Sequence, residues 1–347
     1  NWANSIAQKT NLKSINQLII DLSAYDTQYI PNTWIWEDMG NYYGAGVYAL
    51  SVYDNMCTLF FNSPSEAGKQ TKITKTIPEV SNTEFNNQVL SSEINRDKAY
   101  VFGSPIDNQR VIRGTIPMNR TAFEVKAALP SPPLVFAQEL KKHLSKIGIT
   151  VGEIKLCYSP IKTQNILFQH HSPTLQQIVN VTNHESVNLF AEHLVKQLAY
   201  EKYGAGNFSQ GIEIIKDYWA KQNINLPFLE DGSGLSRFNA ITAKQLTQIL
   251  YLSYRNPKIS HSFFNSIPCA PNGTLWYFNA RNFPNNCLRA KSGSMTRIRS
   301  FAGELKTDSG KIILFSIITN NFSLTQTDII KEIQTLLLDI KRNYRTE

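Results

Sequence analysis

The chain has 347 residues, 42% of them hydrophobic and only 18% charged, so it can bury a large core and is neither fibrous nor disordered. At about 100–200 residues per domain, this length predicts two or three domains. Lys and Arg (35) outnumber Asp and Glu (27), and the formal charge of +8 suits a polyanion such as nucleic acid, a membrane surface or cell-wall polymer. Because the basic residues are scattered singly, we expect no nucleic-acid partner.

Cysteines and apolar runs exclude several further classes. Cys57, Cys157, Cys269 and Cys287 lie far apart with no Cys-x-x-Cys pair, so no zinc or redox motif is indicated and we expect no metal or cofactor. A disulfide between Cys269 and Cys287 is left open. No apolar run approaches the ~18 residues that a transmembrane helix needs, and no signal-peptide pattern is present.

Short β-rich segments dominate the chain up to about residue 130. A helical period then follows at 132–147, ends at Gly148 and leads into a strand at 150–156, which closes an α/β unit. The expected strands before it, each bounded by Asn, Asp, Gly or Pro, are 15–22, 46–52, 56–61, 72–77, 110–116 and 122–128.

The pattern changes near residue 163. A short strand is expected at 166–168, and a mainly helical region follows it. The expected helices are 175–181, 189–203, 211–222, 243–254 and, at the end of the chain, the amphipathic 328–340. Consecutive strands at 288–291, 300–305 and 311–319 precede the last helix, and strands between helices predict an antiparallel sheet covered by helices.

Ser186-Val187-Asn188 is the first group of residues that could carry chemistry. Residues two apart in a regular helix point in different directions, so the Ser and the Asn converge on one pocket only at a turn or a helix entrance. The polar run Thr182-Asn183-His184-Glu185 is read as such an entrance. Taken alone, the pair fits an N-terminal capping role better.

Lys291-Ser292-Gly293, followed by Ser294, is the second group. A strand with a Lys, a hydroxyl and a residue without a side chain offers a cation, a donor and room for a peptide backbone. Such an edge can bind a peptide carboxylate. Three residues in isolation are more typical of an exposed strand end that turns at Gly293.

Asp231-Gly232-Ser233-Gly234-Leu235-Ser236-Arg237 is the third group, and its Asp-Gly and Ser-Gly pairs predict a tight loop. Thr242, just before an apolar period, is read as a helix cap. Ser233 lacks the Gly-x-Ser-x-Gly elbow of an esterase nucleophile. We therefore interpret this segment as scaffolding near a site.

The order of these groups carries more information than any one of them. Ser-x-Asn, then Asp231–Arg237, then Asn272-Gly273-Thr274-Leu275, then Lys-Ser-Gly before two strands and a terminal helix, resembles the class C low-molecular-mass penicillin-binding proteins, the D-alanyl-D-alanine carboxypeptidase/endopeptidase family. In the first half, Trp34-Ile35-Trp36-Glu37-Asp38 and Asn41-Tyr42-Tyr43-Gly44-Ala45 are similar to that family's inserted domains. The resemblance covers nearly the whole chain.

The resemblance implies an α/β (α+β) fold: a penicillin-recognising serine-hydrolase domain, β-lactamase/transpeptidase-like, with an antiparallel sheet and helices, plus β-rich inserted domains. Residues 161–347 would form the C-terminal part of the transpeptidase-like domain. Residues 1–55 and 110–160 would form an outer inserted domain, and 56–109 a nested β-rich one. Serine β-lactamases share the Lys-Ser-Gly type of motif, but the long insert does not fit them.

The implied activity is hydrolysis of the D-Ala-D-Ala bond of peptidoglycan peptides through an acyl-enzyme, with β-lactam antibiotics as further ligands. By motif, Ser186 would relay a proton and Asn188 would position substrate. Lys291 and Ser292 would bind the terminal carboxylate beside Gly293, and the backbone N–H of Ser294 would supply half of an oxyanion hole. We expect a periplasmic or other extracytoplasmic location, with any signal peptide removed or outside this chain.

One departure from the family pattern concerns the nucleophile. The family's Ser-x-x-Lys precedes the β-rich insertion, whereas the only Ser-x-x-Lys here, Ser159-Pro160-Ile161-Lys162, follows it and fits a turn. The chain is therefore either an N-terminally incomplete enzyme, inactive as it stands, or a non-catalytic wall-binding or scaffolding relative. The absence of an initiator Met favours the first interpretation.

Overall fold

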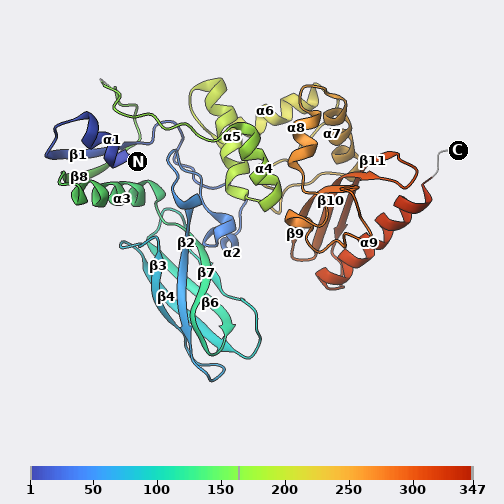
Figure 1. Ribbon diagram of the computed structural model, residues 1–347, viewed down its shortest axis with the longest axis horizontal. Helices are drawn as coiled ribbons and strands as arrows, with labels where there is room; N and C mark the ends of the chain where they lie inside the picture. The colour runs from blue at the N-terminus through green and yellow to red at the C-terminus, as the bar shows by residue number, and fades with distance from the viewer. Residues whose placement is uncertain (1, 163–164, 345–347) are drawn as a thin grey trace. The chain divides into compact units, whose positions relative to one another are not determined.

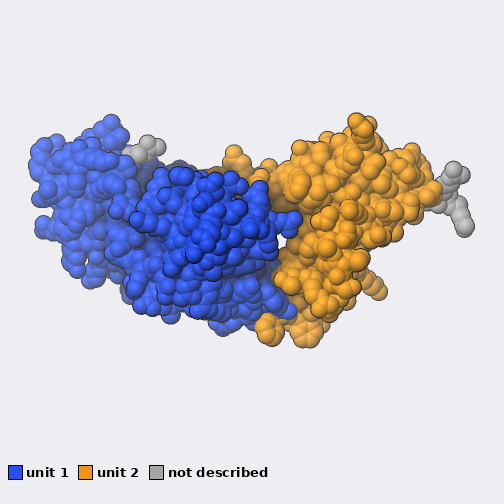
Figure 2. All heavy atoms as spheres, turned by 90° about the horizontal axis from the view of Figure 1, so that it is seen from below, with its two compact units in different colours: residues 1–171, 191–214, 230–237 blue, residues 172–190, 215–229, 238–347 orange. Residues whose placement is uncertain are grey.

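A computed structural model describes residues 2–162 and 165–344 of the chain. The chain divides into two compact units, shown in different colours in Figure 2. Unit 1 comprises 1–171, 191–214 and 230–237; unit 2 comprises 172–190, 215–229 and 238–347. The division expected from the sequence, with 56–109 nested inside 1–55 and 110–160, stays a prediction.

Unit 1 is rich in strands, as expected for the first half of the chain. Its helices before residue 160 are α1 (Trp2–Lys9), α2 (Trp36–Met39), η1 (Tyr42–Gly44), η2 (Tyr53–Asn55) and α3 (Pro132–Lys146). Its strands are β1 (Ser14–Asp21), β2 (Met56–Ser63), β3 (Lys72–Ile77), β4 (Glu84–Ser92), β5 (Tyr100–Phe102), β6 (Gln109–Pro117), β7 (Arg120–Ala128) and β8 (Thr150–Cys157).

The α/β unit predicted around residues 132–156 is present. β1 and β8 pair in parallel, with Ser14 opposite Thr150 and Asp21 opposite Cys157. The apolar side of α3 packs against them because Leu140 and Leu144, one helical turn apart, are buried together with Val151.

Two three-stranded sheets share a second core in unit 1. One has the strand order β3-β2-β7 and the other β4-β6-β5. Alternation along β2 directs Cys57, Leu59 and Phe61 inward, as the period of two in a strand requires. Val89 of β4 and Ile112 of β6 join the same cluster, so the two sheets pack face to face.

Unit 1 differs from the sequence prediction in some of its strands: the strand expected at 46–52 is absent, and β4 was not expected. The segment 46–52 is a loop, although Val47 and Tyr48 are buried in it. Its apolar content therefore reflects burial of a loop, whose backbone is satisfied by bonds such as Val47 N–H to the Tyr29 carbonyl. β4 was missed because polar residues fill most of it, and only Val89 and Ser91 are fully buried.

Unit 2 holds most of the helices in the second half of the chain. The elements from residue 172 onward are α4 (Leu175–Glu185), α5 (Asn188–Tyr203), α6 (Phe208–Ala220), α7 (Ala243–Arg255), α8 (Ser260–Ser266), η3 (Gly273–Leu275), β9 (Leu288–Met295), β10 (Ile298–Lys306), β11 (Ile312–Asn320) and α9 (Gln326–Asn343). Parts of α5 and α6 belong to unit 1. Residues 166–168 form no strand, so that prediction was wrong.

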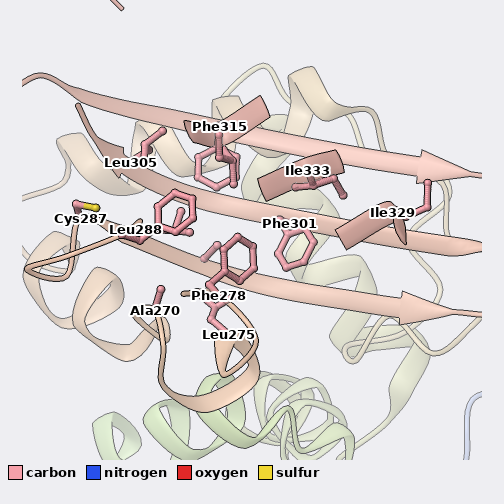
Figure 3. Close-up of a cluster of buried hydrophobic side chains, with 13 residues drawn as sticks. Ala270, Leu275, Phe278, Cys287, Leu288, Phe301, Leu305, Phe315, Ile329 and Ile333 are labelled. Carbon is pink, nitrogen blue, oxygen red and sulfur yellow. The ribbon is translucent and has the colours of Figure 1, made fainter. Parts of the chain in front are cut away.

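The predicted antiparallel sheet covered by helices is the centre of unit 2 (Figure 1). Its order is β11-β10-β9, and both pairs are antiparallel. Alternate residues of β10 face opposite sides: Phe301 and Leu305 pack with Ile333 of α9, whereas Ala302 packs with Leu250 of α7. Figure 3 shows the first of these cores, with Leu275 and Phe278 approaching the same sheet face. The sheet is therefore held rigidly between two helical layers.

Local signals fix several helix ends as expected. Thr242 caps α7 by accepting a hydrogen bond from the backbone N–H of Gln245, whose side chain completes a capping box.

Among the described residues, no helix is long and apolar enough to cross a membrane.

Candidate active site

Ser186 lies in the turn that separates α4 from α5. It adopts a left-handed backbone (φ 56, ψ 50) and its N–H donates to the carbonyl of Thr182, so it closes the C-terminus of α4. α5 begins two residues later at Asn188, which is half-buried. The predicted turn is therefore confirmed, but Thr182–Glu185 is the last turn of α4 and Ser186 is a C-terminal cap, not an N-terminal one.

The end of α4 is held in place by two neighbours. The side-chain amide of Asn183 donates to the hydroxyl of Ser266 on α8 over 2.8 Å, and Ser266 is fully buried. On another side, a Cβ at Gly273 would lie 2.9 Å from the His184 carbonyl oxygen, and Gly273 has a positive φ of 53°. Only glycine fits there without strain. The segment Asn272–Leu275 thus serves to support the turn that carries Ser186.

Lys291 connects the first two groups of residues. Its Nζ donates to the Ser186 hydroxyl over 2.8 Å and to the Ser292 carbonyl over 2.9 Å. Ser186 and Lys291 are 105 positions apart in the sequence, so the fold alone brings them together. A cation and a hydroxyl in direct contact can bind an anion and pass a proton between them.

Lys291 is a cation without a counter-ion in the described part of the chain. Within residues 2–162 and 165–344, no carboxylate forms an ion pair with its ammonium group, whose two acceptors are neutral oxygens. Burial lowers the pKa of Lys291 to about 8, because the charged form loses hydration. An incoming carboxylate would supply the missing charge and would raise this pKa again.

The backbone beside Lys291 lies at a free sheet edge. Over the first part of β9, the edge is covered, because Ala290 N–H donates to the Pro268 carbonyl and Ala270 N–H donates to the Leu288 carbonyl, both over 3.0 Å. Outward-facing groups recur at every second residue of an antiparallel strand, so Ser292 and Ser294 also direct their backbone polar groups outward. In the described part of the chain, neither receives a partner strand on that side.

Gly293 and the two serines complete this edge. Ser292 is half-buried and Ser294 is exposed. A Cβ at Gly293 would lie 2.5 Å from the hydroxyl oxygen of Ser300 on β10, so glycine leaves space on the face that Lys291 shares. All six residues predicted for the site, Ser186, Asn188, Lys291, Ser292, Gly293 and Ser294, belong to unit 2.

The third group, Asp231–Arg237, has a structural role in unit 1. Asp231 accepts hydrogen bonds from the Trp34 indole N–H (2.9 Å) and from the backbone N–H of Ser236 (2.6 Å). Sequence reasoning missed Glu192, which is fully buried and accepts from the backbone N–H groups of Gly232 and Ser233. Burial, with a contribution from the Asp231 charge, raises the pKa of Glu192 to about 7. A Glu inside an amphipathic helix pattern gives no local sign of such a role.

The other candidates from the sequence are placed as follows. Ser159 is exposed in a bend of unit 1 after β8, where its carbonyl oxygen lies 3.3 Å from the Cys157 sulfur. Cys269 and Cys287 are free thiols in this structure. No group of His, Cys, Asp and Glu among the described residues could hold a metal ion.

Comparison with known proteins gives the family. The model of the D-Ala-D-Ala carboxypeptidase 3 (S13) family matches residues 5–343. The chain belongs to this family. The resemblance inferred from motif order is therefore confirmed, and with it the expected class of enzyme, a serine-type D-Ala-D-Ala carboxypeptidase.

Three relatives of this S13 chain are carboxypeptidases. Penicillin-sensitive carboxypeptidase A of Dictyostelium discoideum is 26% identical over 97% of the chain and 68% of its own length. The D-alanyl-D-alanine carboxypeptidase of Actinomadura sp. is 24% identical over 88% of this chain and 60% of its own length. DacB of Haemophilus influenzae is 24% identical over 98% of this chain and 72% of its own length. The chain thus spans 60% to 72% of the length of these relatives.

A solved structure confirms the fold class of the S13 chain. Penicillin binding protein 4 (dacB) of Haemophilus influenzae superimposes with a TM-score of 0.83 at 22% identity, over 98% of this chain and 79% of that one. A second structure of that protein, complexed with a β-lactam, gives a TM-score of 0.72 at 21% identity, over 85% of this chain and 71% of that one.

Proposed function

We propose that Ser186, Asn188 and the edge Lys291–Ser294 form the carboxylate-binding part of a D-Ala-D-Ala carboxypeptidase active site. The observation that carries the proposal is the 2.8 Å hydrogen bond from Lys291 Nζ to the Ser186 hydroxyl, next to a free strand edge. The substrate would be a peptidoglycan peptide that ends in D-Ala-D-Ala.

Binding would use the free edge of β9. The terminal carboxylate would accept a charge-assisted hydrogen bond from Lys291 and a second bond from the Ser292 hydroxyl. The peptide backbone would lie alongside Gly293 as an added strand. The scissile carbonyl oxygen would then face the outward N–H of Ser294, which would stabilise the negative charge of the tetrahedral state.

Acyl transfer follows the family pattern. A nucleophilic serine attacks the carbonyl carbon between the two D-alanines, the C–N bond breaks, and the serine proton reaches the departing amine through the Ser186 hydroxyl. Water then hydrolyses the acyl-enzyme. We assign no nucleophile among the 347 residues, because Ser159 belongs to a bend in unit 1 and Ser186 is assigned the relay.

A β-lactam would use the same subsite. Support comes from the family and from the β-lactam complex of the Haemophilus influenzae structure. Since peptidoglycan lies outside the cytoplasmic membrane, we further propose a periplasmic or surface location. Fractionation of the native cells should recover the protein outside the cytosol, and recovery in the cytosol alone would exclude both this location and this substrate.

The lowered pKa of Lys291 predicts the pH dependence of the complete enzyme. Below pH 8 the ammonium group carries its charge and can bind the carboxylate; above pH 8 it loses the proton. We expect kcat/KM for a D-Ala-D-Ala peptide, which reports pKa values of the free enzyme, to fall about tenfold per pH unit above about pH 8. The measurement is a pH profile of kcat/KM.

Lys291→Arg is the matched variant for this profile. Because an Arg side chain keeps its charge to pH values above 12, its profile should lack the fall near pH 8, and an unchanged fall would contradict the assignment. Unfolding would not explain the fall. The folded-state pKa lies below the usual 10.5, so the folded protein releases the Lys291 proton first, and this group makes folding more favourable as the pH rises from 8 to 10.5.

A further inference from the structure

Arg299 of β10 is a buried cation beside the candidate site. It is only 8% exposed, and its single hydrogen bond to another side chain runs from one terminal nitrogen to the Tyr277 hydroxyl. The guanidinium stacks over the rings of Tyr277 (5.1 Å) and Phe301 (4.9 Å). Its Nε is buried and has no hydrogen-bond partner among residues 2–162 and 165–344.

No carboxylate compensates this charge within the described residues. Arg289, on the neighbouring strand of the same sheet, shows the usual arrangement, because its Nε lies 3.7 Å from a carboxylate oxygen of Glu304. Arg299 has five N–H donors, and the described residues offer its guanidinium one acceptor, the neutral Tyr277 hydroxyl. Burial lowers the pKa of Arg299, and no acidic group among the described residues opposes that shift. A buried guanidinium without an anion is costly to the fold, so its presence calls for a reason other than stability.

The strand register places Arg299 next to the substrate edge. Arg299 pairs with Ser294, and Phe301 pairs with Ser292. Residues directly opposite in an antiparallel pair share a face, so Arg299 lies on the face of Ser292 and Ser294. Lys291 pairs with Ala302 and lies on the opposite face. A cation that no described carboxylate pairs with therefore lies on each of the two faces of the edge strand.

We infer that Arg299 is a second cation of the carboxylate subsite and determines its specificity for a free C-terminal carboxylate. The inference rests on the proposed function. Lys291 binds the carboxylate from one face of β9, while Arg299 binds it from the other face, next to the Ser292 hydroxyl. The planar guanidinium fork matches two carboxylate oxygens, which a single Lys cannot do. Tyr277 is a positioning residue, because its hydroxyl holds one end of the fork.

The test compares two peptides that differ only at the C-terminus. Binding of an N-acetylated peptide ending in D-Ala-D-Ala is measured by calorimetry beside its C-terminal amide, for wild type, Arg299→Gln, Arg299→Lys and the control Arg289→Gln. We expect Arg299→Gln to lower affinity for the acid by about tenfold or more and to leave affinity for the amide unchanged. Arg299→Lys should restore part of the preference, and Arg289→Gln should keep all of it.

A purely structural Arg299 predicts a different result. In that case Arg299→Gln would lower the melting temperature while the acid-to-amide affinity ratio stayed at the wild-type value, and our inference would be overturned. If wild type bound neither peptide, the proposed function would fail, and acetate would decide the inference. A saturable acetate-induced shift of the Arg299 side-chain N–H resonance, seen in wild type and kept in Arg289→Gln, supports an anion site; no shift overturns it.

Discussion

Lys291→Ala is expected to lower kcat/KM of the complete enzyme for a D-Ala-D-Ala peptide by a factor that corresponds to about 2–4 kcal/mol of transition-state stabilisation. The ammonium group forms no ion pair with any described carboxylate, so it can give a substrate carboxylate a charge-assisted hydrogen bond, about twice as strong as a neutral one. Turnover should fall together with affinity if this contact strengthens in the tetrahedral state. Steady-state kinetics with the peptide measure both.

Two controls separate this effect from damage to the fold. Lys306→Ala removes an exposed Lys at the end of β10 in the same sheet and should leave kcat/KM unchanged. The melting temperature of Lys291→Ala should stay close to that of wild type, because the side chain contributes a buried charge more than apolar packing. Wild-type activity in Lys291→Ala with an unchanged melt would remove Lys291 from the site.

Asp26→Ala is expected to cost about 3–5 kcal/mol in the free energy of unfolding. Lys196 of α5 is completely buried, and its Nζ lies 2.7 Å from an Asp26 carboxylate oxygen and 2.5 Å from the Gln28 carbonyl. Without Asp26, a buried ammonium group would keep one neutral acceptor and the ring of Phe208 at 4.5 Å. Urea unfolding followed by fluorescence gives the difference.

A matched pair of variants identifies the cause of that loss. Glu66→Ala breaks an exposed ion pair to Lys69 (3.3 Å) in the same unit and should cost at most about 1 kcal/mol. Lys196→Met should cost less than Asp26→Ala, because it removes the buried charge and leaves Asp26 partly exposed to water. Equal costs for Asp26→Ala and Glu66→Ala would show that the pair is worth no more than a surface contact.

Periodic segments were predictable because their burial follows their own sequence. α9 is an example: Ile329, Ile333 and Leu337 recur at helical spacing and all three are buried. β4 shows the opposite case. Most of its residues are polar, so the sequence has no apolar alternation that would predict a strand there. Elements of this kind depend on their neighbours more than on their own residues.

Individual polar and charged residues followed the same division. Lys291 and Ser186 could be proposed for a site because they belong to recognisable motifs, although neither motif shows that the two side chains touch. Glu192, Lys196 and Arg299 carried no local signal, because each is a charged residue in an otherwise ordinary helix or strand. Their burial arises from contacts with segments far away in the sequence, which one chain without its fold cannot reveal.

The decisive measurement is a crystal structure of the protein with a bound peptide ending in D-Ala-D-Ala. We expect the terminal carboxylate within hydrogen-bond distance of Lys291 Nζ and the Ser292 hydroxyl, and the peptide backbone along the free edge of β9 with its scissile carbonyl toward the Ser294 N–H. A peptide bound elsewhere, with this edge empty and the Lys291–Ser186 hydrogen bond undisturbed, would contradict it.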